Sequence, residues 1–144
     1  MGRVADILAT KGTQVHSVSR DSLVHDAVRL MVRLNVGSVV VMDGLTPTGF
    51  FTERDCLHRV TLDGRDPRTV TVGQVMSDQL VLVDADRTIQ ECMSIMTQSR
   101  IRHLLVADAS RMLGVVSIGD VVKHLTREQE FEIEHLTRYI TGVA

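Results

Sequence analysis

The apolar and polar positions of the chain follow one pattern that occurs twice. Each copy begins with a short stretch of strand-forming residues, at 14–18 and again at 80–84, which predicts a β-strand. Farther along, residues 38–43 and 103–108 form continuous apolar runs, which are typical of strands buried on both faces of a sheet. A turn and a further short strand follow each run, and a second helical stretch ends each copy.

Helical periodicity lies between the first two strands of each copy. The apolar residues within 23–34 fall on one stripe of a helix, and so do those within 89–96. Ser22 and Thr88 stand where the two helices are expected to begin, and we predict that their hydroxyls cap them. Thr88 and Glu91 also have the spacing of a capping box.

The two copies align as an internal repeat. Residues 18–60 lie opposite residues 83–125 at one constant offset, with no gap. Self-similarity of this kind indicates that the architecture is built from two equivalent units. The alignment pairs two glycines, two hydroxyl residues and two aspartates. These pairs are Gly49 with Gly114, Thr52 with Ser117, and Asp55 with Asp120.

The order of elements is therefore β-α-β-β-α, twice, which predicts an α/β fold. A single unit of about sixty residues is marginally stable alone, because small domains bury too little surface. We therefore expect the two units to pack about a pseudo-two-fold axis, with a short N-terminal helix and a longer C-terminal helix added. The predicted division is residues 1–66 for the first repeat with the N-terminal helix, 67–126 for the second repeat, and 127–144 for the C-terminal helix. Residues 63–68, DGRDPR, predict the linker.

Composition narrows the class of protein. The chain has 144 residues, a net charge of −2 and no long basic run, which argues against a nucleic-acid-binding protein. No apolar window approaches the length of a membrane span, so we expect no membrane association and a cytoplasmic location. Cys56 and Cys92 lack the spacing of a metal site or a disulfide framework and are interpreted as small buried hydrophobic residues. The six histidines show no metal-ligand spacing either.

Two tetrapeptides with a hydroxyl residue followed by aspartate stand at equivalent places in the repeats. They are TERD, residues 52–55, and SIGD, residues 117–120, and each lies where a strand turns into a helix. One interpretation is structural, because a hydroxyl and a carboxylate at this spacing can form a capping box. The other is functional: a helix N-terminus attracts phosphate, and a carboxylate one turn later can accept hydrogen bonds from ribose hydroxyls. The two interpretations are compatible.

The ordered set of segments resembles a tandem pair of CBS domains, the cystathionine-β-synthase-type regulatory repeat or Bateman module. In the first repeat the resemblance rests on VADILATKG, VHSVSRDSLVHDAVRLM, NVGSVVVMD and GFFTERD. In the second it rests on VGQVM, LVLVDADRTIQECMSIM, RIRHLLVAD and GVVSIGD. The chain looks like the small stand-alone bacterial type, although both repeats lack the proline that is frequent in the family's buried strand.

The resemblance implies two ligand pockets in a cleft between the repeats. The pocket at Asp120 would take Ser117 and Gly119 from the second repeat and Thr13, Val18, Val36 and Gly37 from the first. The pocket at Asp55 would take Thr52 and Arg54 from the first repeat and Leu80, Val83, Ile101 and Arg102 from the second. Arg102 and His103 would lie near phosphate groups. The implied ligands are adenine nucleotides (AMP, ADP or ATP) or NAD(H).

The leading hypothesis is therefore a regulatory, signal-transducing module that senses adenine nucleotides and acts on a partner protein of unknown identity. It would have no catalytic residues, no metal and no catalytic cofactor. The alternative is a ligand-free scaffold for protein interaction or dimerisation, in which the tetrapeptides are only caps. The resemblance also implies a homodimer formed through helical faces that carry Leu57, Val60 and Leu62 in one repeat and Val121, Val122 and Leu125 in the other.

Overall fold

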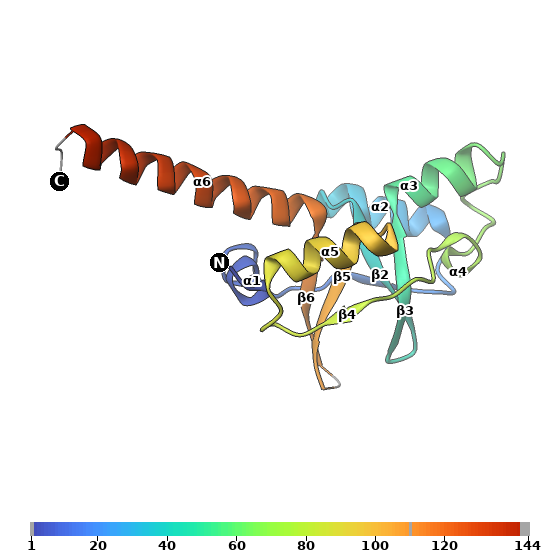
Figure 1. Ribbon diagram of the computed structural model, residues 1–144. Helices are drawn as coiled ribbons and strands as arrows, with labels where there is room; N and C mark the ends of the chain where they lie inside the picture. Colours follow the sequence, from blue (N-terminus) through green and yellow to red (C-terminus); the bar gives the residue numbers. More distant parts are fainter. Residues whose placement is uncertain (1, 110, 142–144) are drawn as a thin grey trace. The chain divides into compact units, whose positions relative to one another are not determined.

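The computed structural model describes residues 2–109 and 111–141, and they form two compact units. One unit, here called the central unit, is continuous in sequence from Gln14 to Val81. The other, here called the terminal unit, combines Met1–Thr13 with Leu82–Ala144. Each unit holds one three-stranded sheet with helices packed against it (Figure 1). The predicted α/β class with two repeats is confirmed.

The central unit is built on the sheet β1-β2-β3. Strand β1 (Ser17–Ser19) pairs in parallel with β2 (Ser38–Asp43), and β2 pairs in antiparallel with β3 (Thr46–Thr52). Its helices are α2 (Val24–Leu34), α3 (Glu53–Asp55), the π-helical turn η1 (Cys56–Thr61) and α4 (Val72–Val75). Its core is aliphatic apart from the phenyl rings of Phe50 and Phe51, which are both buried.

The terminal unit repeats this plan on the sheet β4-β5-β6. Strand β4 (Leu82–Val83) runs parallel to β5 (His103–Asp108), which pairs in antiparallel with β6 (Arg111–Ser117). Its helices are α1 (Val4–Lys11), α5 (Ile89–Ser99) and α6 (Ile118–Thr141).

The internal repeat extends to backbone detail. Strands β2 and β5 have the same burial pattern, with three fully buried residues in the middle. Each also carries a register shift against its antiparallel neighbour at the equivalent place. Helices α2 and α5 both end in a left-handed residue, Asn35 and Arg100, each with φ of 54°. These features lie at the offset found in the sequence, so they confirm the repeat.

The N-terminal helix packs with the second repeat rather than with the repeat that follows it in sequence. Val4 donates its backbone N–H to the carbonyl of Arg87 at 2.9 Å, and Ala5 donates to Ala85 at 2.9 Å. Helix α4, which precedes the second repeat in sequence, packs instead with the first repeat. The backbone N–H of Val72 donates to the carbonyl of Ser22 at 2.8 Å. The compact units therefore differ from the predicted division, which kept each short helix with the repeat that follows it.

The segment predicted to be the linker, residues 63–68, lies inside the central unit. The backbone N–H of His25 donates to the carbonyl of Pro67 at 2.9 Å, which ties this segment to the start of α2. The chain instead passes from one unit to the other after Thr13 and after Val81.

The C-terminal helix is not a separate element, which corrects the sequence prediction. The helix α6 runs without interruption from Ile118 to Thr141, so the second helix of the repeat and the predicted last helix are one. No proline or glycine interrupts the chain after Gly119 in this helix, whereas in the first repeat Gly64 and Pro67 follow the end of η1. Ion pairs four residues apart, such as Arg138 with Glu134 at 2.8 Å, support its exposed half.

Three smaller predictions have mixed outcomes. Thr88 caps α5, because its hydroxyl accepts a hydrogen bond from the backbone N–H of Glu91 at 3.1 Å. Ser22 does not cap α2: the residue at the N-cap is Leu23, which makes no side-chain cap bond. The first strands of the repeats, β1 and β4, are shorter than the predicted 14–18 and 80–84.

Candidate functional site

Both hydroxyl-x-x-Asp segments form reciprocal capping boxes at a strand-to-helix junction. At the start of α3, Asp55 N–H donates to Thr52 Oγ1 at 3.1 Å and Thr52 N–H donates to Asp55 Oδ2 at 3.0 Å. At the start of α6, the same two bonds join Ser117 and Asp120, at 3.2 and 2.8 Å. The structural interpretation of the tetrapeptides is therefore confirmed for both repeats.

The capping boxes occupy one carboxylate oxygen of each aspartate. Within residues 2–109 and 111–141, Oδ1 of Asp55 and Oδ1 of Asp120 accept no hydrogen bond. A carboxylate oxygen has two lone pairs, so each remaining oxygen can accept two donors. Capping thus leaves each aspartate able to bind a ligand hydroxyl.

The residue before each central strand lies against the start of the helix that holds the aspartate. Glu53 N–H donates to the carbonyl of Gly37 at 3.0 Å, and Ile118 N–H donates to the carbonyl of Arg102 at 2.9 Å. The fold therefore groups Val36 and Gly37 with Thr52, Arg54 and Asp55 in the central unit. We call this group the central half-site.

The terminal half-site has the same construction from the second repeat. Its members in the predicted set are Ile101, Arg102, His103, Ser117, Gly119 and Asp120. Of the other predicted residues, Val18 lies in β1 and Leu80 near the end of the central unit, while the terminal unit holds the exposed Thr13 and the buried Val83. Each implied pocket combines residues of both units, so its assembly stays a prediction.

The two half-sites differ in charge. In the central half-site, the carboxylate carbon of Glu53 lies 3.6 Å from where a side chain on Gly37 would begin, so two acidic groups, Glu53 and Asp55, flank this place. In the terminal half-site the equivalents of Gly37 and Glu53 are Arg102 and Ile118, which bring a cation and an apolar side chain. The sequence-based prediction of a more positive second repeat agrees with this difference.

Lys11 is a member of the terminal half-site that the sequence analysis missed. Its Nζ donates to Asp120 Oδ2 at 2.7 Å and to the carbonyl of Val115 at 2.7 Å. Lys11 is the last residue of α1. Its contact with Asp120 was not predicted because the N-terminal helix was assigned to the first repeat. The internal repeat itself gave no signal, since Lys11 precedes the aligned segments.

Electrostatic effects follow from this arrangement. Burial raises the pKa of Asp120, but the hydrogen bonds from Lys11 and Ser117 outweigh it, so the pKa of the carboxyl lies below its usual value. Burial lowers the pKa of His103, and the nearby Lys11 lowers it further. His103 is therefore a neutral hydrogen-bonding group at pH 7, and the positive charge of the terminal half-site comes from Lys11 and Arg102.

Replacing Lys11 by methionine is expected to raise the pKa of Asp120, because burial then acts with less opposition. Since the pKa of Asp120 is lowered by folding, its ionised form stabilises the terminal unit at neutral pH, and this stabilisation is lost as the pH falls through the lowered pKa. The measurement is an NMR titration of the Asp120 carboxyl carbon. Arg111→Gln, which removes an exposed charge elsewhere in the unit, is the control; an unchanged titration in Lys11→Met would contradict the pairing.

The two thiols have no features of a catalytic nucleophile. Burial raises the pKa of both Cys56 and Cys92, which disfavours the reactive thiolate. Among the described residues, no three His, Cys, Asp or Glu side chains form a group that could hold a metal ion. In the same part of the chain, no helix combines the length and the apolar character needed to cross a membrane.

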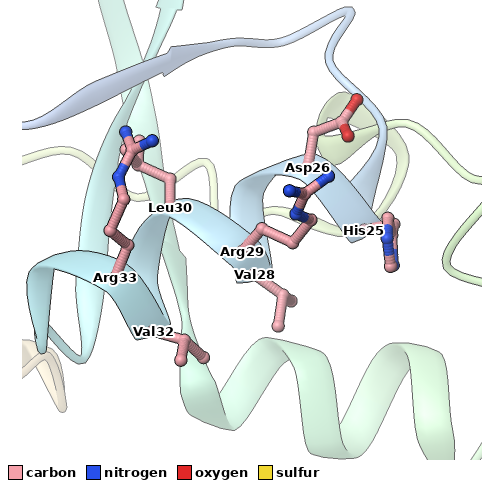
Figure 2. A pocket seen from close by; sticks show the side chains of 7 residues that line it. All are labelled: His25, Asp26, Val28, Arg29, Leu30, Val32 and Arg33. Atoms are coloured by element: carbon pink, nitrogen blue, oxygen red, sulfur yellow. The ribbon is translucent and has the colours of Figure 1, made fainter.

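A hollow in the central unit lies away from the half-sites. Its volume is about 710 Å³, and every residue that lines it belongs to α2. Figure 2 shows Arg33 and Asp26 reaching to one side of this helix and Val28 to the other. None of the predicted ligand residues lines this hollow, and a single helix provides no second wall to enclose a ligand.

Comparisons with known proteins agree with a fold built from two copies of one domain. The family model described as "CBS domain" matches residues 4–61 and 72–127. The chain is 34% identical to the mitochondrial CBS domain-containing protein CBSX3 of Arabidopsis thaliana, over 96% of this chain and 72% of that protein. It is 33% identical to the CBS domain-containing protein YhcV of Bacillus subtilis, over 82% of this chain and 84% of that protein.

A solved structure is similar over nearly the whole fold. It is a protein with CBS domains from Burkholderia ambifaria, described as a candidate signal-transduction protein. The two superpose with a TM-score of 0.84 at 34% identity, covering 89% of this chain and 96% of the other.

Proposed function

Because the chain belongs to the CBS-domain family and carries two copies of the domain, we propose that it is a regulatory module that binds adenine nucleotides. The proposed ligands are AMP, ADP, ATP or NAD(H), and the bound state would be signalled to a partner protein. The observation that carries the proposal is the free carboxylate oxygen that remains on Asp55 and on Asp120 after capping. Two hydroxyls on adjacent ribose carbons are donors of the kind that such an oxygen accepts.

The half-sites would have different parts in recognition. Arg102 and Lys11 give the terminal half-site a positive character, which favours the phosphates of a nucleotide. Glu53 and Asp55 outnumber Arg54 and give the central half-site a net negative character, which favours neutral or donor groups such as ribose hydroxyls and the adenine amine. We therefore propose that phosphate recognition depends mainly on the terminal unit.

Replacing both aspartates by asparagine is expected to weaken nucleotide binding. Asparagine keeps an oxygen for the capping bond but loses the charge, so the capped helix is retained while a charge-assisted bond to ribose is lost. Each such bond contributes roughly 1.5–3 kcal/mol, so calorimetry with AMP, ATP and NADH should show affinity at least tenfold lower. Glu91→Gln makes the same kind of change at the cap of α5, outside the half-sites, and is the matched control. A folded Asp55→Asn, Asp120→Asn protein that binds AMP like the parent would refute the ribose assignment.

A ligand-free scaffold is the second candidate, and one observation favours it. The capping boxes already give both tetrapeptides a structural role, and Lys11 already pairs with Asp120. A thermal-shift screen separates the candidates, since a ligand present at a hundred times its Kd stabilises the native state by about 2.7 kcal/mol. No shift with any nucleotide would favour the scaffold.

Self-association is a further part of the proposal. Leu57, Leu62 and Val122 are 59%, 77% and 56% exposed, and apolar side chains at this exposure favour an interface. Two residues predicted for the same faces, Val60 and Val121, belong instead to the cores of their units, at 2% and 0% exposed. We expect sedimentation at micromolar concentration to give twice the 16.0 kDa mass of one chain. Leu57→Glu should shift the distribution toward the single chain, and a parent that sediments as one chain would contradict the proposal.

A further inference from the structure

A second, basic pocket lies in the terminal unit between helices α1 and α6. Its volume is about 350 Å³, and it begins at Asp120 and continues along α6 away from the start of that helix. The residues that line it are Ile7, Thr10 and Lys11 from α1 and Asp120, Lys123, His124 and Arg127 from α6. The four residues of α6 follow the spacing i, i+3, i+4 and i+7, which places them on one face of the helix.

The pocket has an excess of positive charge. It contains three permanent cations, Lys11, Lys123 and Arg127, against one carboxylate, Asp120, which is already paired with Lys11. The neighbouring Glu128 is engaged by His124, with 3.2 Å between Nε2 and Oε1. Neither Lys123 nor Arg127 forms an ion pair with these two carboxylates.

Lys123 and Arg127 have no stabilising role that the structure reveals. Neither forms a hydrogen bond or an ion pair with any residue of 2–109 or 111–141. Like charges four residues apart on a helix destabilise it, so this pair acts against the helix that carries it. Lys11 also has a donor to spare, because its ammonium group has three hydrogens and two are used, by Asp120 and Val115.

The first repeat does not carry the same basic residues at the equivalent place. The residue aligned with His124 is Arg59, whose guanidinium donates to the carbonyl of Met76 at 2.7 Å. Leu62 stands at the position of Arg127. The basic lining is thus specific to the second repeat. It is not explained by the similarity between the two repeats.

We propose that this pocket binds the phosphoryl groups of a phosphate ester or polyphosphate. A net pocket charge of two positive units matches a phosphate dianion, and lysine and arginine are the side chains that bind phosphate most strongly. The hydroxyl of Thr10 adds a neutral donor at the rim. The inference concerns phosphoryl groups only and does not depend on the proposed binding of ribose at Asp55 and Asp120.

The test is calorimetry of the whole chain with inorganic tripolyphosphate at low ionic strength. We expect the parent to bind it and Lys123→Gln, Arg127→Gln to bind it at least tenfold more weakly. The control is Arg111→Gln, Arg138→Gln, which removes the same charge from exposed positions of the same unit and should change the affinity less than twofold. A cooperative thermal transition in each variant would show that both are folded.

ATP and adenosine distinguish the sources of the phosphoryl group. If ATP affinity falls together with tripolyphosphate affinity while adenosine affinity does not change, the pocket holds the phosphates of a nucleotide. If tripolyphosphate affinity alone falls, the pocket serves a separate phosphorylated compound. A parent that does not bind tripolyphosphate, or equal losses in the two double variants, would overturn the proposal.

Discussion

Replacing Gly49 by alanine is expected to destabilise the central unit by about 3 kcal/mol. A Cβ atom at this position would lie 2.1 Å from the carbonyl oxygen of Ser77. Ser77 cannot move away easily, because it exchanges two backbone hydrogen bonds with Phe50, at 3.0 and 2.9 Å. The extra methyl group therefore breaks this bridge or strains β3. Urea unfolding followed by circular dichroism measures the change.

Gly114→Ala is the matched control, because Gly114 is the equivalent residue in the second repeat. A Cβ atom there would meet only the end of the Leu8 side chain, at 2.6 Å, which can move by a change of rotamer. We expect a loss of about 1 kcal/mol, the usual cost of a strained rotamer. Equal losses at the two glycines would show that the backbone contact at Ser77 is not the cause.

Deleting residues 1–12 is expected to unfold the terminal unit and leave the central unit folded. The deletion removes Val4, Ile7 and Leu8, which are 0%, 5% and 6% exposed. Burial of such side chains contributes about 1.5–3 kcal/mol each, so the total loss is about 5 kcal/mol or more. That loss is comparable with the whole stability of a small domain.

Hydrogen exchange measured by mass spectrometry locates the effect of the deletion. Protection should disappear from β5 and β6 and persist in β2 and β3, although the deleted segment directly precedes the first repeat in sequence. Removing residues 130–144, whose described side chains are exposed, is the control and should leave both sheets protected. Loss of protection in β2 and β3 instead would mean that α1 stabilises the repeat that follows it.

Much of the fold could be predicted from the sequence because the signals are local. The runs that became β2 and β5 are apolar through their four middle residues, and Thr88 with Glu91 has a recognisable cap spacing. The continuity of α6 was missed because its exposed half follows no core periodicity that connects it with the repeat. Its length depends instead on the absence of helix breakers after Gly119.

The parts of the candidate site that form within one repeat could be predicted from the sequence. The two capping boxes follow from residue type and spacing, and the structure confirms them. Lys11 could not be found in this way, since its contact with Asp120 joins residues far apart in the sequence. The basic character of Lys123 and Arg127 was visible in the sequence, but a pocket requires a second wall, and that wall is α1.

The exchange of α1 and α4 between the repeats has a consequence for folding during synthesis. The ribosome releases α1 before the central unit, but its hydrogen-bond partners Ala85 and Arg87 and its packing partner Gly114 emerge only after the whole central unit. The central unit, a continuous segment from Gln14 to Val81, can therefore fold while the second repeat is still being translated. Until β6 is complete, the apolar face of α1, with Val4, Ile7 and Leu8, is a candidate surface for a chaperone. The apolar face of α1 thus stays without its packing partners until the second repeat has been translated.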